Sequence, residues 1–429
     1  MLALFFLVIL PLSLVAGYRA WWRNQVAAAT NALKAAGVPV QPSELGALYE
    51  PVPPALDTRA YFDAAFLAVK PLPGAKTVGL PLYDNGVALE YDTPMDPAVR
   101  ARIEEILADN AEVFAQLGAA AAVPRGAYVM VEPGGEVFPR GSASKIFSLL
   151  LQLRLALHLQ DGNMGEAFET LHTMFQLSAQ FRQDPGLAGV SPLTVVGEPL
   201  AAFLGTGGAT PAQLETLDTV LAAMDMHAAA YPALVAEMME NHSRLVPKHH
   251  RSRFQLEDVT WNTARTRKEL LEFELEAVAA FRKDEQALYD YWKIQSETVT
   301  GMHNGDTPYR EFYYRDSAVS IMNRALFGMH LVKLYRAALA VERHRQDRAA
   351  FPESLAALAP DYLAAPPLDP ETGAPLHFQA TAGGFTIYAC SDPEIVEWLL
   401  SEQQMSRASK FYRGPITGRS FAVRYRANG

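Results

Sequence analysis

The sequence is poor in cysteine. Its 429 residues include a single one, Cys390, so no internal disulfide can form. Cys390 ends the apolar run Phe385–Cys390, and no residue of that run could act as a base toward the thiol. We therefore expect Cys390 to be a small buried hydrophobic side chain, a common role of free cysteine.

An excess of positive charge is also missing. There are 37 Lys and Arg against 47 Asp and Glu, a net charge of -10. Such a balance lacks the electrostatic footprint of a duplex-binding protein, so we predict no nucleic-acid partner. Acidic residues are absent after Glu402, which leaves a basic tail. We interpret this tail as a solvated edge that pairs with the acidic body, and contact with phosphate or membrane is the alternative.

Signatures of metal and cofactor sites are lacking as well. The ten histidines form no His-Glu-x-x-His motif, and a single cysteine cannot supply a Cys pair. The glycine-rich stretch 205–208 lacks the Lys-Ser/Thr of a phosphate loop. We predict no cofactor and no metal.

One catalytic signature is present in part. Ser142-Ala143-Ser144-Lys145 matches the Ser-x-x-Lys motif of penicillin-binding proteins and β-lactamases, in which the lysine takes the serine proton. The Lys-Thr-Gly strand of those enzymes is missing. We interpret Ser142 as the N-cap of a buried helix, and we keep a peptidoglycan-type hydrolase that uses Ser142 and Lys145 as the alternative.

A long apolar run stands at the N-terminus. Residues 2–16 carry no charge, and residues 2–18 just reach the length of a membrane span. Tyr18, Trp21 and Trp22 follow, as in an aromatic belt at the headgroups. A signal peptide cleaved near Gly17 is the competing interpretation, weakened by the missing basic n-region. We predict an uncleaved single-pass anchor, with the membrane as partner through residues 2–18.

Helical periodicity dominates the rest of the chain. We expect a mainly α fold with an irregular helical body. Its clearest unit is a tetratricopeptide-like helical hairpin around Asp161-Gly162-Asn163. The predicted helices cover 24–36, 97–121 after the cap Asp96, 146–157, 167–178, a helix from the capping box at Thr210 through Met226, one or two long helices within 232–300, and a helix of about 30 residues from Thr307-Pro308 that Pro352 ends.

Aromatic and charged groups are densest at the start of that last helix. Interfaces are enriched in this mixture. Tyr309, Arg310, Tyr313, Tyr314 and Arg315 are our interaction candidates.

The C-terminal region changes character. Apolar segments Leu376–Phe378 and Phe385–Tyr388 flank a glycine pair, which predicts a β-hairpin, and Phe421–Tyr425 is a further candidate strand. We expect the hairpin to fold back on the long helix with Phe385 and Ile387 facing inward, because a hairpin alone is marginal in water.

A resemblance extends over about residues 339–388. The run includes Phe351-Pro352-Glu353-Ser354-Leu355, Pro367-Leu368-Asp369-Pro370 and Phe385-Thr386-Ile387-Tyr388. It resembles the C-terminal part of type II secretion major pseudopilins. Residues 1–25 lack the prepilin leader of that family, so polymerisation into a pilus is not expected. The whole layout also resembles a broad group of uncharacterised bacterial membrane-anchored helical proteins, which implies architecture and outward topology without an activity.

These observations define four segments and one leading function. The segments are a membrane anchor (1–23), a helical and proline-rich collar (24–96), a helical body (97–316), and a long helix with the β-hairpin module and basic tail (317–429). We predict a non-enzymatic, membrane-tethered interaction or scaffold protein of the bacterial cell envelope. It would sit in the inner membrane with its body outside the cytoplasm and other envelope proteins as partners. The alternative topology, with the body in the cytoplasm, follows from the positive-inside rule, because Arg19 and Arg23 flank the span on its C-terminal side. A small-ligand binder with a pocket between helices is a further alternative.

Overall fold

A computed structural model describes most of the chain, with gaps. The described residues are 10–48, 52–70, 81, 89, 91, 94–124, 126–128, 141–181, 196–245, 261–303, 309–369, 373–381, 384–389 and 421–426. They divide into two compact units. Unit 1 takes its described residues from Met1–Glu50 and Tyr231–Asn323, and unit 2 takes the others. The four segments predicted from the sequence remain a prediction.

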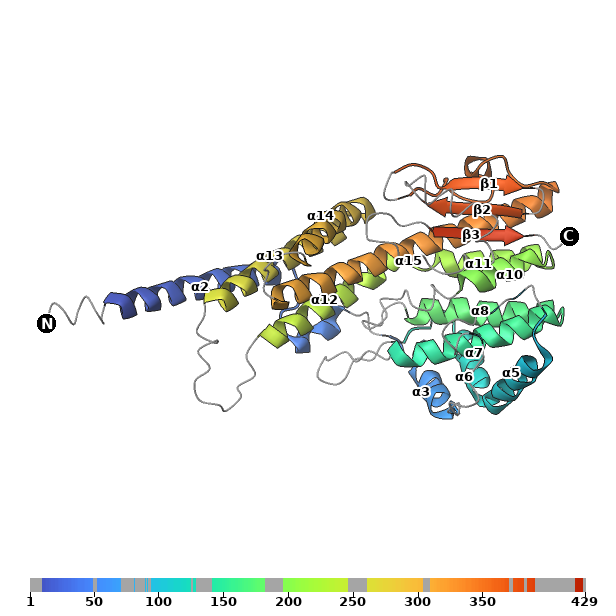
Figure 1. The fold of residues 1–429 in the computed structure, drawn as a ribbon, viewed down its shortest axis with the longest axis horizontal. Coiled ribbons are helices and arrows are strands. Elements are labelled where there is room, and N and C mark those ends of the chain that lie inside the picture. Colours follow the sequence, from blue (N-terminus) through green and yellow to red (C-terminus); the bar gives the residue numbers. More distant parts are fainter. Residues whose placement is uncertain are drawn as a thin grey trace. The chain divides into compact units, whose positions relative to one another are not determined.

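The fold is mainly helical, as predicted (Figure 1). Among the described residues, no helix combines the length and the apolarity needed to cross a membrane. The first residues of the predicted span, 1–9, lie outside the described ranges. The elements are α2 Leu10–Ala35, η2 Pro42–Leu48, α3 Arg59–Ala68, α5 Pro97–Asp109, α6 Ala111–Ala121, α7 Gly141–Gln160, α8 Met164–Gln180, α10 Gly197–Gly205, α11 Pro211–Ala222, α12 Met226–Leu245, α13 Trp261–Lys283, α14 Glu285–His303, α15 Tyr309–Arg348, η5 Leu355–Leu358, β1 His377–Thr381, β2 Gly384–Ala389 and β3 Phe421–Arg426.

Unit 1 is built around the second half of α2. Leu33 is 1% exposed and belongs to a core cluster with Val235 of α12 and with Leu271 and Val278 of α13. Val38, just past the end of α2, is buried in the same cluster. Gly37 adopts φ +69, a conformation that glycine accepts without strain, and it allows the chain to leave the helix there.

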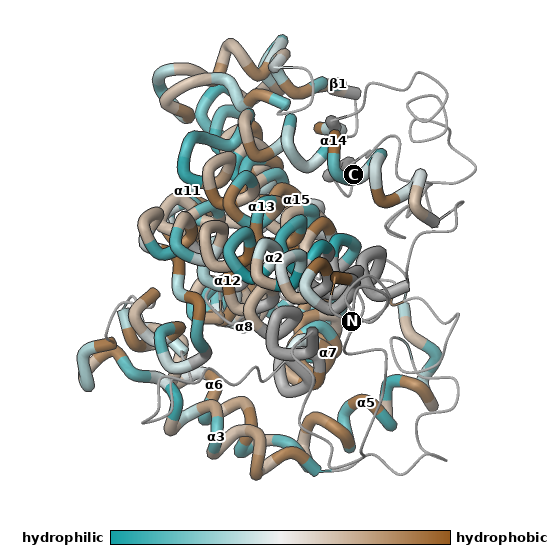
Figure 2. The backbone as a smooth tube through the Cα atoms, turned by 90° about the vertical axis from the view of Figure 1, so that its left-hand side faces the viewer, coloured by the Kyte–Doolittle hydropathy of each residue, from teal (hydrophilic) through white to brown (hydrophobic). Residues whose placement is uncertain are grey.

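In unit 2, the predicted hairpin of helices is present as α7 and α8. It is joined at Asp161–Asn163, where Gly162 has φ +69. α3 and α6 lie side by side, and hydrophobic and hydrophilic stretches alternate along both (Figure 2). Phe62 of α3 packs against Phe181 with tilted rings whose centroids are 4.5 Å apart, so this aromatic contact joins α3 to the end of α8.

One predicted helix is divided. The sequence predicted a single helix over 97–121, but Asn110 separates α5 from α6. The Asn110 side chain donates to the Ile106 carbonyl at 2.8 Å and accepts from the Lys70 amide at 3.0 Å. A side-chain amide that bonds to the backbone competes with the helical ladder, which explains the break. The N-cap at Asp96 and the first-turn Pro97 are confirmed.

Two further boundaries differ from the prediction. The capping box at Thr210 is confirmed, but its helix ends at Ala222 rather than running past Met226. Asp225 then caps α12 by accepting from the Ala228 amide at 2.8 Å. Residues 232–300 hold parts of three helices instead of one or two, because Asp284 caps α14 in the same way. Both breaks occur at aspartates that bind backbone amides.

The C-terminal region contains a three-stranded antiparallel sheet in the order β1-β2-β3. The predicted hairpin is confirmed, with Phe378 opposite Ile387, and the predicted last strand pairs with β2 through Ile387 opposite Val423. Phe385 and Ile387 are 1% and 0% exposed, so both face inward as expected. The Phe385 ring lies 5.6 Å from that of Phe351, just beyond α15. The side chains of β3 and Cys390 lie outside what the structure describes.

Replacing Ile387 with Asp should loosen this sheet. The fully buried position would receive a charge without a partner, at a cost of several kcal/mol. Limited proteolysis should then cut between Ala364 and Gly384 while the helices stay resistant. Gln379→Asp, at an exposed position of β1, is the control and should leave the digest unchanged. Equal digestion of the Ile387→Asp and wild-type chains would contradict the packing.

Candidate interaction surfaces

The predicted catalytic pair lies on one helix. Ser142 and Lys145 are in the first turns of α7, but their side chains are outside the described part of the structure. The sequence interpretation of Ser142 as a cap, and the alternative of a Ser-x-x-Lys hydrolase, therefore both stay predictions.

Of the five side chains in the predicted aromatic and charged cluster, the structure describes that of Arg315. Tyr309, Arg310, Tyr313 and Tyr314 form the first turns of α15, and their side chains are not described. Arg315 places its guanidinium 5.3 Å from the centre of the Phe273 ring on α13. Its Nη1 also donates to the Gln295 side chain of α14 at 3.4 Å. Arg315 thus joins helices within unit 1.

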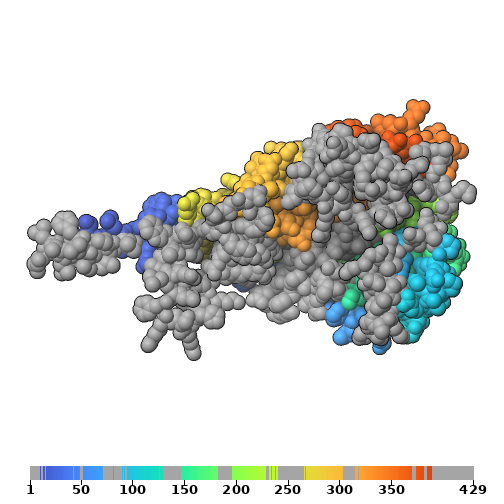
Figure 3. Space-filling view, viewed as in Figure 1, coloured from blue at the N-terminus to red at the C-terminus, as the bar shows by residue number. Residues whose placement is uncertain are grey.

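The first half of α2 exposes a row of large apolar side chains. Leu10, Leu14, Tyr18 and Trp21 are 37%, 65%, 39% and 50% exposed. Their spacing of four, four and three residues places them on one helical face. The rings of Trp21 and Trp22 meet edge to face at 4.7 Å, and Tyr18 lies about equally far from both, at 6.0 and 6.1 Å. In the space-filling view, the described N-terminal atoms of α2 reach the surface (Figure 3).

A groove of about 560 Å³ opens among α5, α6 and α7 in unit 2. Its walls are mostly apolar, and Arg154 and His158 are its polar groups. The Arg154 guanidinium sits 4.9 Å from the centre of the Phe114 ring. The other wall residues are Leu107, Ala111 and Ala115.

Hydrogen bonds fix the orientation of Arg154. Its Nε donates to His158 Nε2 at 3.3 Å, and its Nη2 lies 3.4 Å from Glu166 Oε2. Burial, and then the Arg154 charge, lower the pKa of His158. His158 therefore stays neutral near pH 7 and can accept at Nε2, which leaves the guanidinium as the positive group of the groove.

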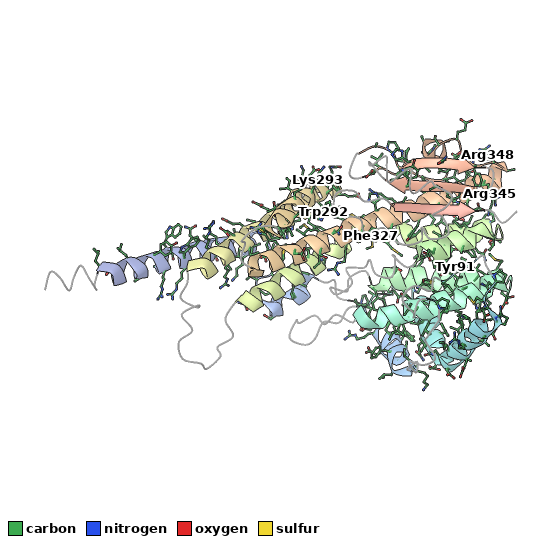
Figure 4. All side chains as sticks on the ribbon, in the orientation of Figure 1. Tyr91, Trp292, Lys293, Phe327, Arg345 and Arg348 are labelled. Carbon is green, nitrogen blue, oxygen red and sulfur yellow. The ribbon has the colours of Figure 1, made fainter. Side chains whose placement is uncertain are left out.

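A second polar group, partly buried, lies at the start of α10. Burial raises the pKa of Glu198 to about 7. Burial and then the Glu198 charge raise the pKa of Tyr91 and of Tyr335, so the three groups share one environment. The Tyr91 hydroxyl, labelled in Figure 4, is buried without a hydrogen-bond partner. A Cβ at position 197 would lie 2.9 Å from the Tyr335 hydroxyl, so Gly197 permits this close approach.

Sequence reasoning missed both Arg154 and Glu198 as candidates. Each is a single charge within an apolar stretch, at 146–159 and 186–207. Such a charge argues against a membrane span. The same pattern also signals a charge held inside a helical core, where it needs a partner or a shifted pKa.

No group of three or more His, Cys, Asp or Glu within the described ranges is arranged to hold a metal ion. No family model matches the chain, and no curated protein or solved structure matches it either.

Stability should depend on pH through Glu198. The unfolded carboxyl ionises near pH 4.5 and the folded one near 7, so the folded state binds the extra proton between these values. The free energy of unfolding should therefore fall as pH rises from 4.5 to 7 and level off above, by on the order of 2–3 kcal/mol. Glu198→Gln should melt at a higher temperature than the wild type at pH 8, and the advantage should vanish below pH 5.

Circular dichroism of the detergent-solubilised chain measures both melting curves. Glu215→Gln removes an exposed carboxyl from α11 and serves as the control. A melting difference between Glu198→Gln and wild type that is equal at pH 5 and pH 8 would rule out the buried titration.

Proposed function

We propose that this chain is a membrane-tethered interaction or scaffold protein of the bacterial cell envelope, without catalytic activity. The observation that carries the proposal is the division of α2. One unbroken helix exposes Leu14 and Trp21 in its first half and buries Leu33 in its second. A row of large apolar side chains is favoured in an apolar environment such as a bilayer. Because the second half of α2 packs in unit 1, the helix can hold its first half in that environment.

The anchor of the proposal comprises residues 2–18, of which the structure describes Leu10 onward. The cluster of Tyr18, Trp21 and Trp22 supports it, because amphipathic rings favour the headgroup level at the end of a span. The helix then continues for about three turns before Leu33 enters the core of unit 1. A rigid stalk of this kind would hold unit 1 at a fixed distance from the bilayer.

The scaffold part of the proposal rests on the helical hairpin and on the sequence resemblances. The packed α7–α8 pair supports the proposal of a tetratricopeptide-like hairpin, a unit that builds binding surfaces in repeat proteins. The hairpin of strands after α15 fits the resemblance to major pseudopilins over about residues 339–388. From these resemblances we propose an inner-membrane location, an extracytoplasmic body and envelope proteins as partners.

The anchor predicts stable membrane association. The full chain should stay with membranes after carbonate washing. Leu10 lies at the centre of residues 2–18, where an aspartate costs about 3 kcal/mol, so Leu10→Asp should release a measurable fraction. Leu67→Asp replaces an apolar residue of α3 that is 84% exposed and should release none. Wild-type chain in the wash supernatant, with a processed N-terminus, would instead indicate a cleaved signal peptide.

A second candidate function is the binding of a small apolar carboxylate in the groove at Arg154. The apolar wall formed by Phe114 and Leu107 would bury a hydrocarbon or ring, and the oriented guanidinium would pair with a carboxylate. The apolar wall and the oriented guanidinium favour the ligand-binder alternative.

Benzoate and octanoate are suitable probes of the groove. Calorimetry with the full chain should detect binding that weakens about tenfold in Arg154→Gln, since a charged hydrogen bond contributes about 1.5–3 kcal/mol. Arg100→Gln removes an arginine of α5 that pairs with Glu104 and Asp161 outside the groove, and it should bind as wild type does. Octylamine, of opposite charge, should bind less than octanoate. Equal affinity of Arg154→Gln and wild type would exclude this site.

A further inference from the structure

Basic side chains of two helices lie at one level of unit 1. α2 and α13 run side by side, and their C-terminal ends meet where Arg282 donates to the Ala36 carbonyl (Figure 1). The two helices are therefore parallel, and equal steps back along each reach the same height. The Arg282 side chain leans toward the N-terminus of α13 and reaches about one helical turn, which the count must include. Fourteen residues back from this contact, Lys268 then lies between the levels of Trp22 and Val26. Three residues further back, Arg265 lies between the levels of Arg19 and Arg23.

The core cluster supports this register. Leu271 and Leu275 of α13 pack in the cluster that also contains Val26 and Ala29 of α2. The same count puts Leu271 between the levels of Gln25 and Ala29, and Leu275 between those of Ala29 and Leu33, and both leucines share the cluster with Leu33. The basic turn of α13 thus lies beside the aromatic residues of α2, although about 240 residues of chain separate them.

On these two helices, the described charges near this level are mostly positive. α2 carries Arg19 and Arg23 here, both exposed, and contains no carboxylate. α13 adds Arg265, Arg267 and Lys268, of which the Arg267 Nε is buried without a hydrogen-bond partner. Two carboxylates of α13, those of Glu269 and Glu272, form ion pairs with two of these cations.

Those two carboxylates hold their cations weakly. Arg265 pairs with Glu269 at 2.7 Å, and Lys268 pairs with Glu272 at 2.6 Å. The Arg265 side chain is 66% exposed and that of Glu272 is 50% exposed. The other members, Glu269 and Lys268, are 29% and 25% exposed. Partly exposed pairs between helix residues four apart contribute little to stability, so a lipid phosphate can compete with these carboxylates.

We propose that Arg19, Arg23, Arg265, Arg267 and Lys268 form a basic collar that binds the phosphates of anionic lipids. The proposal rests on the membrane anchor proposed above. Tyr18, Trp21 and Trp22 set the headgroup level, and the collar stands at that level on two helices. Cations next to a bilayer attract anionic lipid within about a Debye length, which is roughly 8–10 Å at moderate salt. The collar therefore selects phosphatidylglycerol-type over phosphatidylcholine-type headgroups.

The test uses the full chain reconstituted in phosphatidylcholine bilayers with a trace of spin-labelled phosphatidylglycerol or phosphatidylcholine. Electron paramagnetic resonance measures the lipid that the protein immobilises. We expect the anionic label to be preferred about two- to fourfold at low salt, with the preference lost in 1 M NaCl. Equal immobilisation of both labels would overturn the collar and leave the anchor intact. No immobilised lipid at all would overturn the anchor itself.

Variants separate the collar from the ordinary flank of an anchor. Arg265→Gln with Lys268→Gln should lower the preference by about half, although neither residue is near the anchor in sequence. A quadruple variant that also carries Glu269→Gln and Glu272→Gln has the net charge of wild type, because two charges of each sign are removed. Its preference for the anionic label should stay below that of wild type. Lys34→Gln, about 16 Å further along α2 than Arg23, is the matched control and should keep the wild-type value. An unchanged preference in both α13 variants would refute the part of α13 in the collar.

Discussion

The docking of the second half of α2 between α12 and α13 is the constraint on which unit 1 depends. Leu33 is the buried residue of α2 in this contact, and Arg282 of α13 bonds to the C-terminal end of α2. One arm of Arg282 donates to the Ala36 carbonyl, which α2 leaves without an intrahelical partner, and the other donates to the Tyr231 hydroxyl at 2.7 Å. The guanidinium also lies 5.4 Å from the centre of the Tyr231 ring. A cation at a helix C-terminus is favourable in itself, and here it joins three helices.

The sequence predicted the elements of the fold better than their ends. Periodicity identified α7, α8 and the strands of the sheet, and capping chemistry located Asp96 and Thr210 correctly. The missed break at Asn110 depended on the distant amide of Lys70, which no local window contains. Polar residues such as Asp284 start helices when their side chains reach a backbone amide, and in a long charged stretch they resemble any solvated position.

The candidate sites were less predictable than the fold. The residues chosen from composition, including Ser142 and Tyr313, are at helix starts, where polar and aromatic types also serve capping and packing. Arg154 and Glu198 gave the more informative pattern, a single charge in an apolar run. What each would do depended on groups far away in sequence: Phe114 for Arg154, and Tyr91 and Tyr335 for Glu198. Tertiary placement, and not local sequence, decides whether such a charge is paired or titrates.

Buried charge is handled in two different ways within unit 2. Glu342 of α15 is fully buried, and its carboxylate accepts from Arg345 at 2.7 and 2.6 Å and from Gln346 at 2.9 Å. That carboxylate is satisfied within one turn of its own helix, with Arg345 labelled in Figure 4. Glu198 instead has its pKa raised by burial, so near neutral pH its environment selects the protonated form. A carboxylate with all its hydrogen bonds made adds rigidity, whereas an acid that titrates near neutrality makes the stability of its surroundings depend on pH. By this argument, the stability of the start of α10 follows the pH of the compartment.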